Sequence, residues 1–184
     1  MGNPLRLRRP VAELAAKGQV IEIAEKIGSF ERLAEIVEAD LATLDPDKIP
    51  EDWREAAVSG WLEFGFADAQ KQVVSLVGEV AVTLDAVCQR CLEPFRLELA
   101  TDLRLLPTTV DQGVSAGTDF ELWELDEEMV CPAEIVEEVL IMAMPLSAMH
   151  ETGAACKTYE PAGEAVGQTT RPFAALKAEL DQNK

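Results

Sequence analysis

The chain has 184 residues, of which 48% are hydrophobic and 27% are charged, and this is the composition of a globular protein long enough for one domain. With 34 acidic against 16 basic residues its net charge is −18, and such a surface repels a phosphate backbone, which disfavours direct binding of nucleic acid. The apolar runs are shorter than the roughly 18 to 20 residues that cross a bilayer, and no apolar stretch follows the N-terminal arginines, so the sequence predicts a cytoplasmic protein with neither a membrane span nor a secretory signal.

The N-terminal part of the chain is predicted to contain short elements joined by loops. Residues 5–10 are expected to form an extended arm and residues 18–23 a short strand. A helix is expected to begin after Gly28, with Ser29 as its N-cap. Its apolar face is predicted to consist of Leu33, Ile36 and Val37. Residues 41–50, which include two prolines, are expected to form a loop.

From Val58 onward the hydrophobic period changes to two. Three successive runs, over residues 58–66, 74–85 and 95–104, place apolar side chains on one side and mostly polar ones on the other. Alternation of this kind is typical of antiparallel strands that bury one face. The three runs therefore predict an antiparallel β-meander.

A helix dominates the prediction for the C-terminal part. Residues 107–118 form a turn-rich stretch, and residues 120–125 are expected to form another short strand. The helix is predicted over residues 132–142, because it opens with a proline and carries Glu134 near the positive end of its dipole. Its apolar stripe consists of Ile135, Val136, Val139, Leu140 and Ala143.

Taken together, these elements predict an α+β fold. A few helices are expected to pack on one face of the antiparallel meander, with flexible loops between the elements. Residues 1–184 are predicted to form a single domain. Within it, the segment 152–170 is rich in Gly, Ala and Glu and is expected to be flexible.

Four cysteines and a single histidine define the candidate chemistry. Cys88 and Cys91 form a CxxC motif at the predicted turn between the second and third strands, a spacing that can present two sulfurs to one metal ion or to each other. His150 and Cys156 follow later in the chain. Because zinc favours thiolate and imidazole ligands, we predict that these four residues bind one structural Zn²⁺.

Two other interpretations of the cysteines stay open at this point. Cys88 and Cys91 can be half-buried thiols at a turn without a metal, or they can be a redox pair. A strand after Cys91 argues against the redox pair, because a thioredoxin-like CxxC lies at a helix N-terminus. Cys131 precedes Pro132 and is expected to be a buried thiol at a helix start, with a role as substitute ligand if Cys156 lies too far away.

Three segments, in chain order, resemble the YceD family of bacterial and plastid proteins. They are CQRCLEPF over residues 88–95, the acidic helix with its continuation over 134–151 followed by Cys156, and RPFAALK over 171–177. The sequence departs from the family pattern at Ala148, where the family has a proline, and at Arg171, where it has an asparagine. The stretch from His150 to Cys156 is also longer than in many relatives.

The resemblance implies a role in ribosome biogenesis. The family is associated with accumulation of 23S ribosomal RNA, and its gene commonly lies beside that of a small basic zinc-ribbon protein of the large subunit. It implies no reaction, and the sequence contains neither a phosphate-binding glycine loop nor an HExxH motif. We therefore expect a non-catalytic factor that supports synthesis, processing or stability of 23S rRNA.

A long acidic window suggests how such a factor recognises its partner. From Leu105 to Cys156 the chain has 11 acidic residues and no lysine or arginine. This window is either a solvated face that keeps the protein soluble, or a docking face for a basic large-subunit ribosomal protein or a pre-ribosomal particle. The side chains predicted to bind the partner are Glu127, Glu128, Glu134, Glu137, Glu138, Met142 and Met144.

Two alternative functions belong to other classes. One is a thiol-dependent or metal-dependent enzyme that uses Cys88, Cys91 and His150. The other is a direct rRNA binder, which would need a basic groove assembled from Arg6, Arg8, Arg9, Arg90, Arg96 and Arg104.

Overall fold

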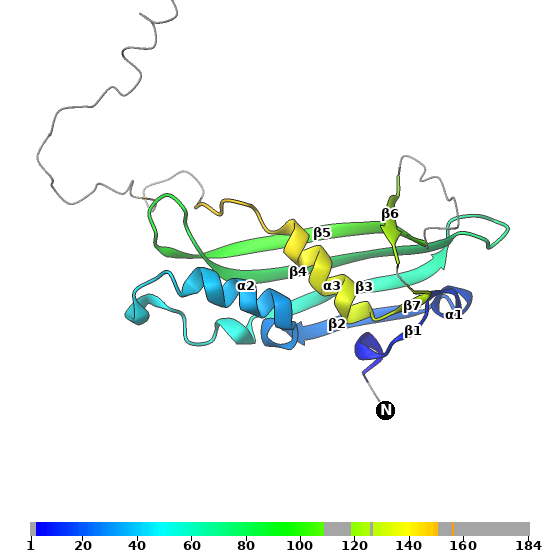
Figure 1. Cartoon of the computed structure of the whole chain (residues 1–184), viewed down its shortest axis with the longest axis horizontal. Coiled ribbons are helices and arrows are strands. Elements are labelled where there is room, and N and C mark those ends of the chain that lie inside the picture. The colour runs from blue at the N-terminus through cyan, green and yellow to red at the C-terminus, as the bar shows by residue number, and fades with distance from the viewer. Residues whose placement is uncertain (1–2, 109–118, 126, 151–155, 157–184) are drawn as a thin grey trace, which may run out of the picture.

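The computed structural model describes residues 3–108, 119–125, 127–150 and 156. They form an α+β fold, as predicted, in which helices cover one face of a five-stranded sheet (Figure 1). The strand order of this sheet is β2-β3-β4-β5-β6. Its strands are β2 Val20–Lys26, β3 Ala57–Phe66, β4 Val74–Val87, β5 Pro94–Thr108 and β6 Glu121–Glu124.

The sequence-predicted meander is confirmed in its central strands. β2, β3, β4 and β5 pair antiparallel with their neighbours in chain order. β6 was expected as a strand, but it pairs parallel to β5, so the sheet is mixed at that edge. Pro107 and Thr108, which were expected to open a turn-rich stretch, pair with β6 instead, and the rest of that stretch, residues 109–118, lies outside the described residues.

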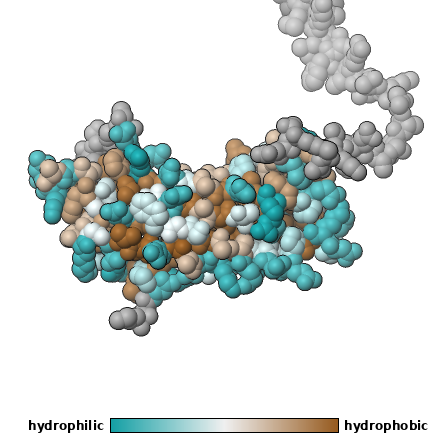
Figure 2. All heavy atoms as spheres, turned by 180° about the vertical axis from the view of Figure 1, so that it is seen from behind, coloured by the Kyte–Doolittle hydropathy of each residue, from teal (hydrophilic) through white to brown (hydrophobic). Residues whose placement is uncertain are grey.

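Alternation along the strands separates a buried face from an exposed one. On the helix side, Leu62, Phe64, Leu76 and Val80 are fully buried. On the opposite side, which faces the viewer in Figure 2, hydrophilic and hydrophobic side chains lie next to each other. There Val20 is 51% exposed, as expected for an antiparallel sheet with one face in water.

Three helices supply the other half of the core. They are α1 Val11–Ala16, α2 Glu31–Leu41 and α3 Pro132–Ala143, and α2 and α3 lie across the same face of the sheet (Figure 1). The predicted helix at residues 132–142 is thus confirmed, and Ile135, Val136 and Leu140 are its buried side chains. The helix ends before Pro145, which cannot continue it.

The start of α2 corrects a sequence-based expectation. Phe30 is the N-cap residue, and Ser29 ends a preceding 3-10 turn, η2 Ile27–Ser29, so Ser29 does not cap the helix. Leu33, Ala34, Val37 and Leu41 form the buried face of α2. Ile36 was expected on that face but is 39% exposed, because the helix packs against the core through Leu33, Val37 and Leu41 instead.

The N-terminal arm is more ordered than an extended chain. It forms η1 Pro4–Arg6 and then β1 Arg9–Pro10, which pairs with β7 Met129–Val130 in a separate two-stranded sheet. Two further 3-10 turns, η3 Pro46–Lys48 and η4 Trp53–Glu55, interrupt the connection between α2 and β3. Leu5 is fully buried, so the arm contributes to the core.

Two further expectations concern the chain as a whole. Of the segment 152–170, which we expected to be flexible, all but Cys156 lies outside the described residues. The prediction of one domain over residues 1–184 stays a prediction. Among the helices of the described residues, none is long and apolar enough to span a membrane.

Candidate metal centre and acidic groove

A tight turn between β4 and β5 positions the CxxC motif. The backbone N–H of Leu92 donates to the carbonyl of Cys88 at 2.8 Å, and the N–H of Cys88 donates to the carbonyl of Glu93 at 3.0 Å. Leu92 has a φ of 57°, the left-handed conformation that reverses the chain within a few residues. The turn therefore holds Cys88 and Cys91 close together at one end of the sheet.

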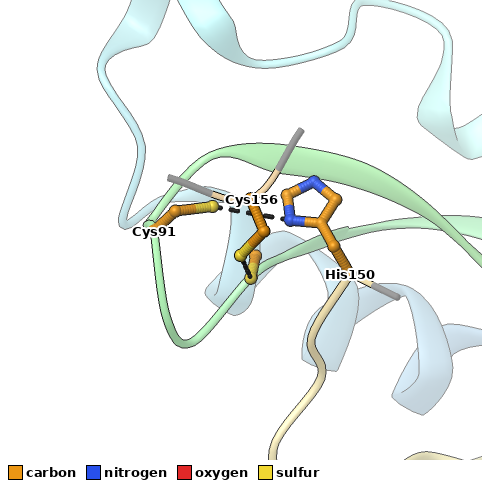
Figure 3. Close-up of side chains that lie close together, drawn as sticks. Cys91, His150 and Cys156 are labelled. Carbon is orange, nitrogen blue, oxygen red and sulfur yellow. Dashed lines mark hydrogen bonds between the residues drawn. The ribbon is translucent and has the colours of Figure 1, made fainter. Parts of the chain in front are cut away.

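The segment that follows α3 runs back to this turn. The N–H of Gln89 donates to the carbonyl of Ala148 at 2.8 Å, which fixes the two segments side by side. The His150 ring lies beside the Phe95 ring, with 4.8 Å between their centroids. Cys156 approaches the same point, so residues far apart in the sequence converge there (Figure 3).

The structure brings together all four predicted metal ligands. Their ligand atoms lie within 4.8 Å of one another. The Cys88 and Cys156 sulfurs are 3.8 Å apart, and the Cys91 sulfur is 3.5 Å from Nδ1 of His150 (Figure 3). No disulfide joins the cysteines. This group could hold a metal ion.

The two distances match a tetrahedral zinc site. With Zn–S bonds of ~2.3 Å and Zn–N bonds of ~2.0 to 2.1 Å, a regular tetrahedron has a sulfur–sulfur edge of ~3.8 Å and a sulfur–nitrogen edge of ~3.5 Å. The observed 3.8 Å and 3.5 Å equal those two edges, and every separation among the four ligand atoms is within 4.8 Å. Three thiols and one imidazole are also a donor set that structural zinc sites use. The residues present therefore fit this ion.

The surroundings of Cys88 favour its thiolate. Burial of the side chain acts to raise the pKa, but backbone N–H groups of His150, Cys91 and Arg90 point at the sulfur and together lower the pKa of Cys88 to about 5. In contrast, burial and the neighbouring sulfurs of Cys88 and Cys91 raise the pKa of Cys156. Backbone donors directed at a buried sulfur are a means of stabilising a metal-bound thiolate.

Cys131 does not belong to this centre. It is buried before α3, and its thiol donates to the carbonyl of Leu5 at 3.7 Å. The structure thus agrees with the expectation of a buried thiol at a helix start. Since Cys156 reaches the cluster, no substitute ligand is needed.

The acidic side chains of α3 make contacts within the protein. Glu134 pairs with Arg8 at 3.1 Å, and Glu138 pairs with Arg32 at 2.6 Å. Glu137 accepts a hydrogen bond from the backbone N–H of Leu33 at 3.1 Å. Because that N–H lies in the first turn of α2, Glu137 supplies the cap that Ser29 does not.

An acidic groove lies between α3 and the β5–β6 edge of the sheet. We define it by the residues that line a space of about 1100 Å³, including Thr101–Leu105 of β5, Asp119–Leu125 around β6, and seven side chains of α3 between Glu134 and Ala143. Eight acidic and two basic residues line it, so its net charge is negative. In Figure 1, α3 crosses the middle of the sheet, and β6 lies toward the end opposite the β4–β5 turn.

The groove includes only part of the predicted partner-binding set. Glu134, Glu137, Glu138 and Met142 line it, and Met142 is 71% exposed. Glu127, Glu128 and Met144 lie outside the lining; both glutamates are exposed, whereas Met144 is partly buried against the core.

Several groove residues were absent from the predicted set. Glu31 and Asp102 lie outside the acidic window, and Asp119, Glu121 and Glu124 lie within it but had no distinguishing pattern. The parallel pairing of β6 with β5 places the latter residues in the groove. No sequence motif predicts that pairing. The only sequence signal was the repetition of acidic residues on a short strand.

Some of the arginines proposed for an RNA-binding groove are engaged elsewhere. Arg8 pairs with Glu134, Arg6 lies 4.0 Å from Glu25, and Arg96 lies 3.8 Å from Asp85. These contacts neutralise part of the positive charge that a phosphate backbone would need.

Comparison with known proteins gives a consistent result. A family model described as "Large ribosomal RNA subunit accumulation protein YceD" matches residues 76–179. The chain is also 31% identical over 118 residues to a protein of that name from Haemophilus influenzae, across 60% of this chain and 67% of the relative. No solved structure matches the chain.

Proposed function

The chain belongs to the YceD family, and on that premise we propose that it supports accumulation of large-subunit 23S ribosomal RNA by binding rather than by catalysis. The match to the family is the observation that carries the proposal. The chemistry of the chain supports it, because the single histidine sits among three cysteines with Nδ1 beside Cys91. A histidine that ligates a metal ion through this nitrogen would not act as a free general base.

Removal of the protein tests this function. Deletion or depletion should lower the ratio of 23S to 16S rRNA, and the wild-type chain expressed from a plasmid should restore it. An unchanged ratio in the depleted cell would refute the proposal.

A structural zinc ion is the cofactor that we propose for the four-residue cluster. Its support is the agreement of the 3.8 Å and 3.5 Å separations with tetrahedral edges, together with the backbone donors around Cys88. Four protein ligands fill a tetrahedral site and leave no position for a substrate. The role of the ion is then to tie the segment after α3 to the β4–β5 turn.

Elemental analysis is the direct test of this cofactor. Protein purified without chelator or metal resin should contain one equivalent of zinc, and less than about half an equivalent would count against the site. The Cys131→Ala variant is a suitable control, because Cys131 lies outside the cluster and its loss should leave the zinc content unchanged.

The partner that we propose is a basic ribosomal protein of the large subunit, bound free or within a pre-ribosomal particle; a small basic zinc-ribbon protein is the first candidate. The support is the net charge of −18 and the absence of lysine and arginine from residue 105 to residue 156. Long-range attraction accelerates encounter with such a chain and competes with its non-specific binding to RNA. An effect on rRNA is then indirect, since a stalled particle exposes RNA to degradation.

One observation favours an alternative function in thiol chemistry. The neighbouring hydrogen-bond donors lower the pKa of Cys88, which favours its thiolate, as in reactive cysteines. The side chain is fully buried, however, which denies a substrate access to the sulfur. An insulin-reduction assay decides between the two: activity in the wild type that is lost in Cys88→Ser would establish the alternative.

A further inference from the structure

The two walls of the acidic groove differ in whether their carboxylates are paired with other groups of the protein. On the α3 wall, Glu134, Glu137 and Glu138 are engaged by Arg8, by the backbone of Leu33 and by Arg32. On the β6 wall, Glu121 and Glu124 form no ion pair within the described part of the chain. These carboxylates are therefore available to a ligand.

An apolar side chain is exposed at the same place. Met142 on the facing helix is 71% exposed. On β6, the pairing with β5 puts Glu121 and the half-buried Trp123 on the side of Leu105 and α3, whereas Leu122 and Glu124 alternate to the other side. Buried Leu103, Leu105 and Ile135 also contribute to the lining. A flexible methionine suits a surface that adapts to apolar side chains of a partner.

We infer that this groove binds a segment of a partner protein that carries both Lys or Arg and apolar side chains, and that Glu121 holds one of its cations. The inference rests on the proposed function, for which it names the docking site. Eight acidic residues against two basic ones in the lining, one of the latter already paired with Glu138, give the charge complementarity. The apolar lining selects against a purely cationic chain.

The same charge argues against other occupants. A nucleic acid or an anionic membrane surface would be repelled by the carboxylates of the groove. A second copy of this chain carries a net charge of −18 and would be repelled as well. At about 1100 Å³ the groove slightly exceeds the ~300 to 1,000 Å³ of pockets that hold drug-sized ligands, so it accommodates several side chains.

A matched pair of charge reversals tests the inference. The groove variant is Glu121→Lys, and the control is Glu63→Lys, which makes the same change in net charge at an exposed position on β3. The probe is a fluorescent peptide of repeating Leu-Lys-Lys-Leu, with oligolysine of equal length as comparison. Affinity is measured by fluorescence anisotropy at low salt, after circular dichroism has shown that both variants are folded.

The groove variant should bind the Leu/Lys peptide about tenfold more weakly than the wild type, and the control should differ by much less. The wild type should prefer the Leu/Lys peptide to oligolysine. Equal weakening by both variants, no preference between the peptides, or no binding by the wild type would each overturn the inference.

A second matched pair tests the apolar part of the groove. Met142→Ser in the groove should weaken binding of the Leu/Lys peptide, whereas Val20→Ser on the opposite face of the sheet should not, although both residues are exposed. Equal effects would contradict an apolar contribution from the groove.

The ratio of 23S to 16S rRNA in cells shows whether a negative result concerns only this inference or also the proposed function. If depletion lowers the ratio and the groove variant restores it fully, the function stands and the groove is not its site. If depletion leaves the ratio unchanged, the proposed function fails, and the peptide measurements judge the groove alone.

Discussion

The two ends of the sheet use polar side chains in opposite ways. At the β4–β5 turn, the ligand atoms of three cysteines and a histidine lie within 4.8 Å of one another, and Cys88 is fully buried. At the β6 edge, Glu121 and Glu124 are exposed beside a large open space. The cysteines and the histidine at the turn contact one another, whereas the carboxylates at the β6 edge are exposed to solvent.

This difference indicates a division of roles. Groups that satisfy each other inside a protein stabilise its structure, while exposed charges beside exposed apolar groups are typical of a surface that binds a partner. The segment after α3 joins the two regions, because it carries His150 to the turn while α3 forms one wall of the groove. On this account zinc fixes the C-terminal end of the helix whose flank is the proposed docking site.

The largest expected effect comes from removing one of the four residues of the proposed metal centre at the β4–β5 turn. Cys88→Ala removes one of four zinc ligands, and we expect loss of the zinc and a fall in the free energy of unfolding of more than about 4 kcal/mol. Zinc content and urea denaturation measure the two effects. Cys131→Ala removes a buried thiol of the same kind and should retain zinc, so equal zinc content in both variants would refute the site.

A smaller effect is expected where α3 supports α2. Glu137→Ala leaves the N–H of Leu33 without its acceptor, and loss of such a cap should lower the free energy of unfolding by about 1 kcal/mol. Glu137→Gln keeps an oxygen acceptor and should recover most of that loss. Glu124→Ala on the opposite wall should leave the urea midpoint unchanged.

If the two alanine variants were equally destabilised, the distinction between the walls of the groove would be wrong. If Glu137→Gln were as unstable as Glu137→Ala, the carboxylate would act through its charge rather than as a cap.

The smallest of the three expected effects is a difference in salt dependence between peptide binding at the groove and zinc binding at the β4–β5 turn. Raising the ionic strength from about 0.05 M to about 0.5 M shortens the screening length, so binding of the Leu/Lys peptide should weaken severalfold. Zinc content should not change, because the metal–ligand bonds of a closed site are not screened by bulk ions. Anisotropy titrations and elemental analysis at both salt concentrations provide the comparison.

The sequence predicts these two regions to different extents. Cysteines and histidine are so few that Cys88, Cys91, His150 and Cys156 formed the natural four-ligand set, and the structure brings them together. Alternation of apolar residues likewise predicted strands β3 to β5, since a half-buried strand requires that pattern.

The groove could not be predicted in the same way, because it depends on register and pairing. Glutamates are numerous, and only the parallel pairing of β6 with β5 separates Glu121 and Glu124 from the other exposed acids. Similarly, the prediction of Ser29 as N-cap used local preference, whereas the cap comes from Glu137, which lies 104 residues from Leu33 in the sequence. Contacts of this range are set by tertiary packing.

Site-specific photo-crosslinking in cells tests the central claim most directly. A photoreactive amino acid is placed at Met142 in the groove or at Val20 on the opposite face of the sheet, two exposed apolar positions. Products are identified by mass spectrometry. The account predicts a product between position 142 and a basic protein of the large ribosomal subunit, and no such product from position 20. Crosslinks to that protein from both positions, from position 20 alone, or from neither would contradict it.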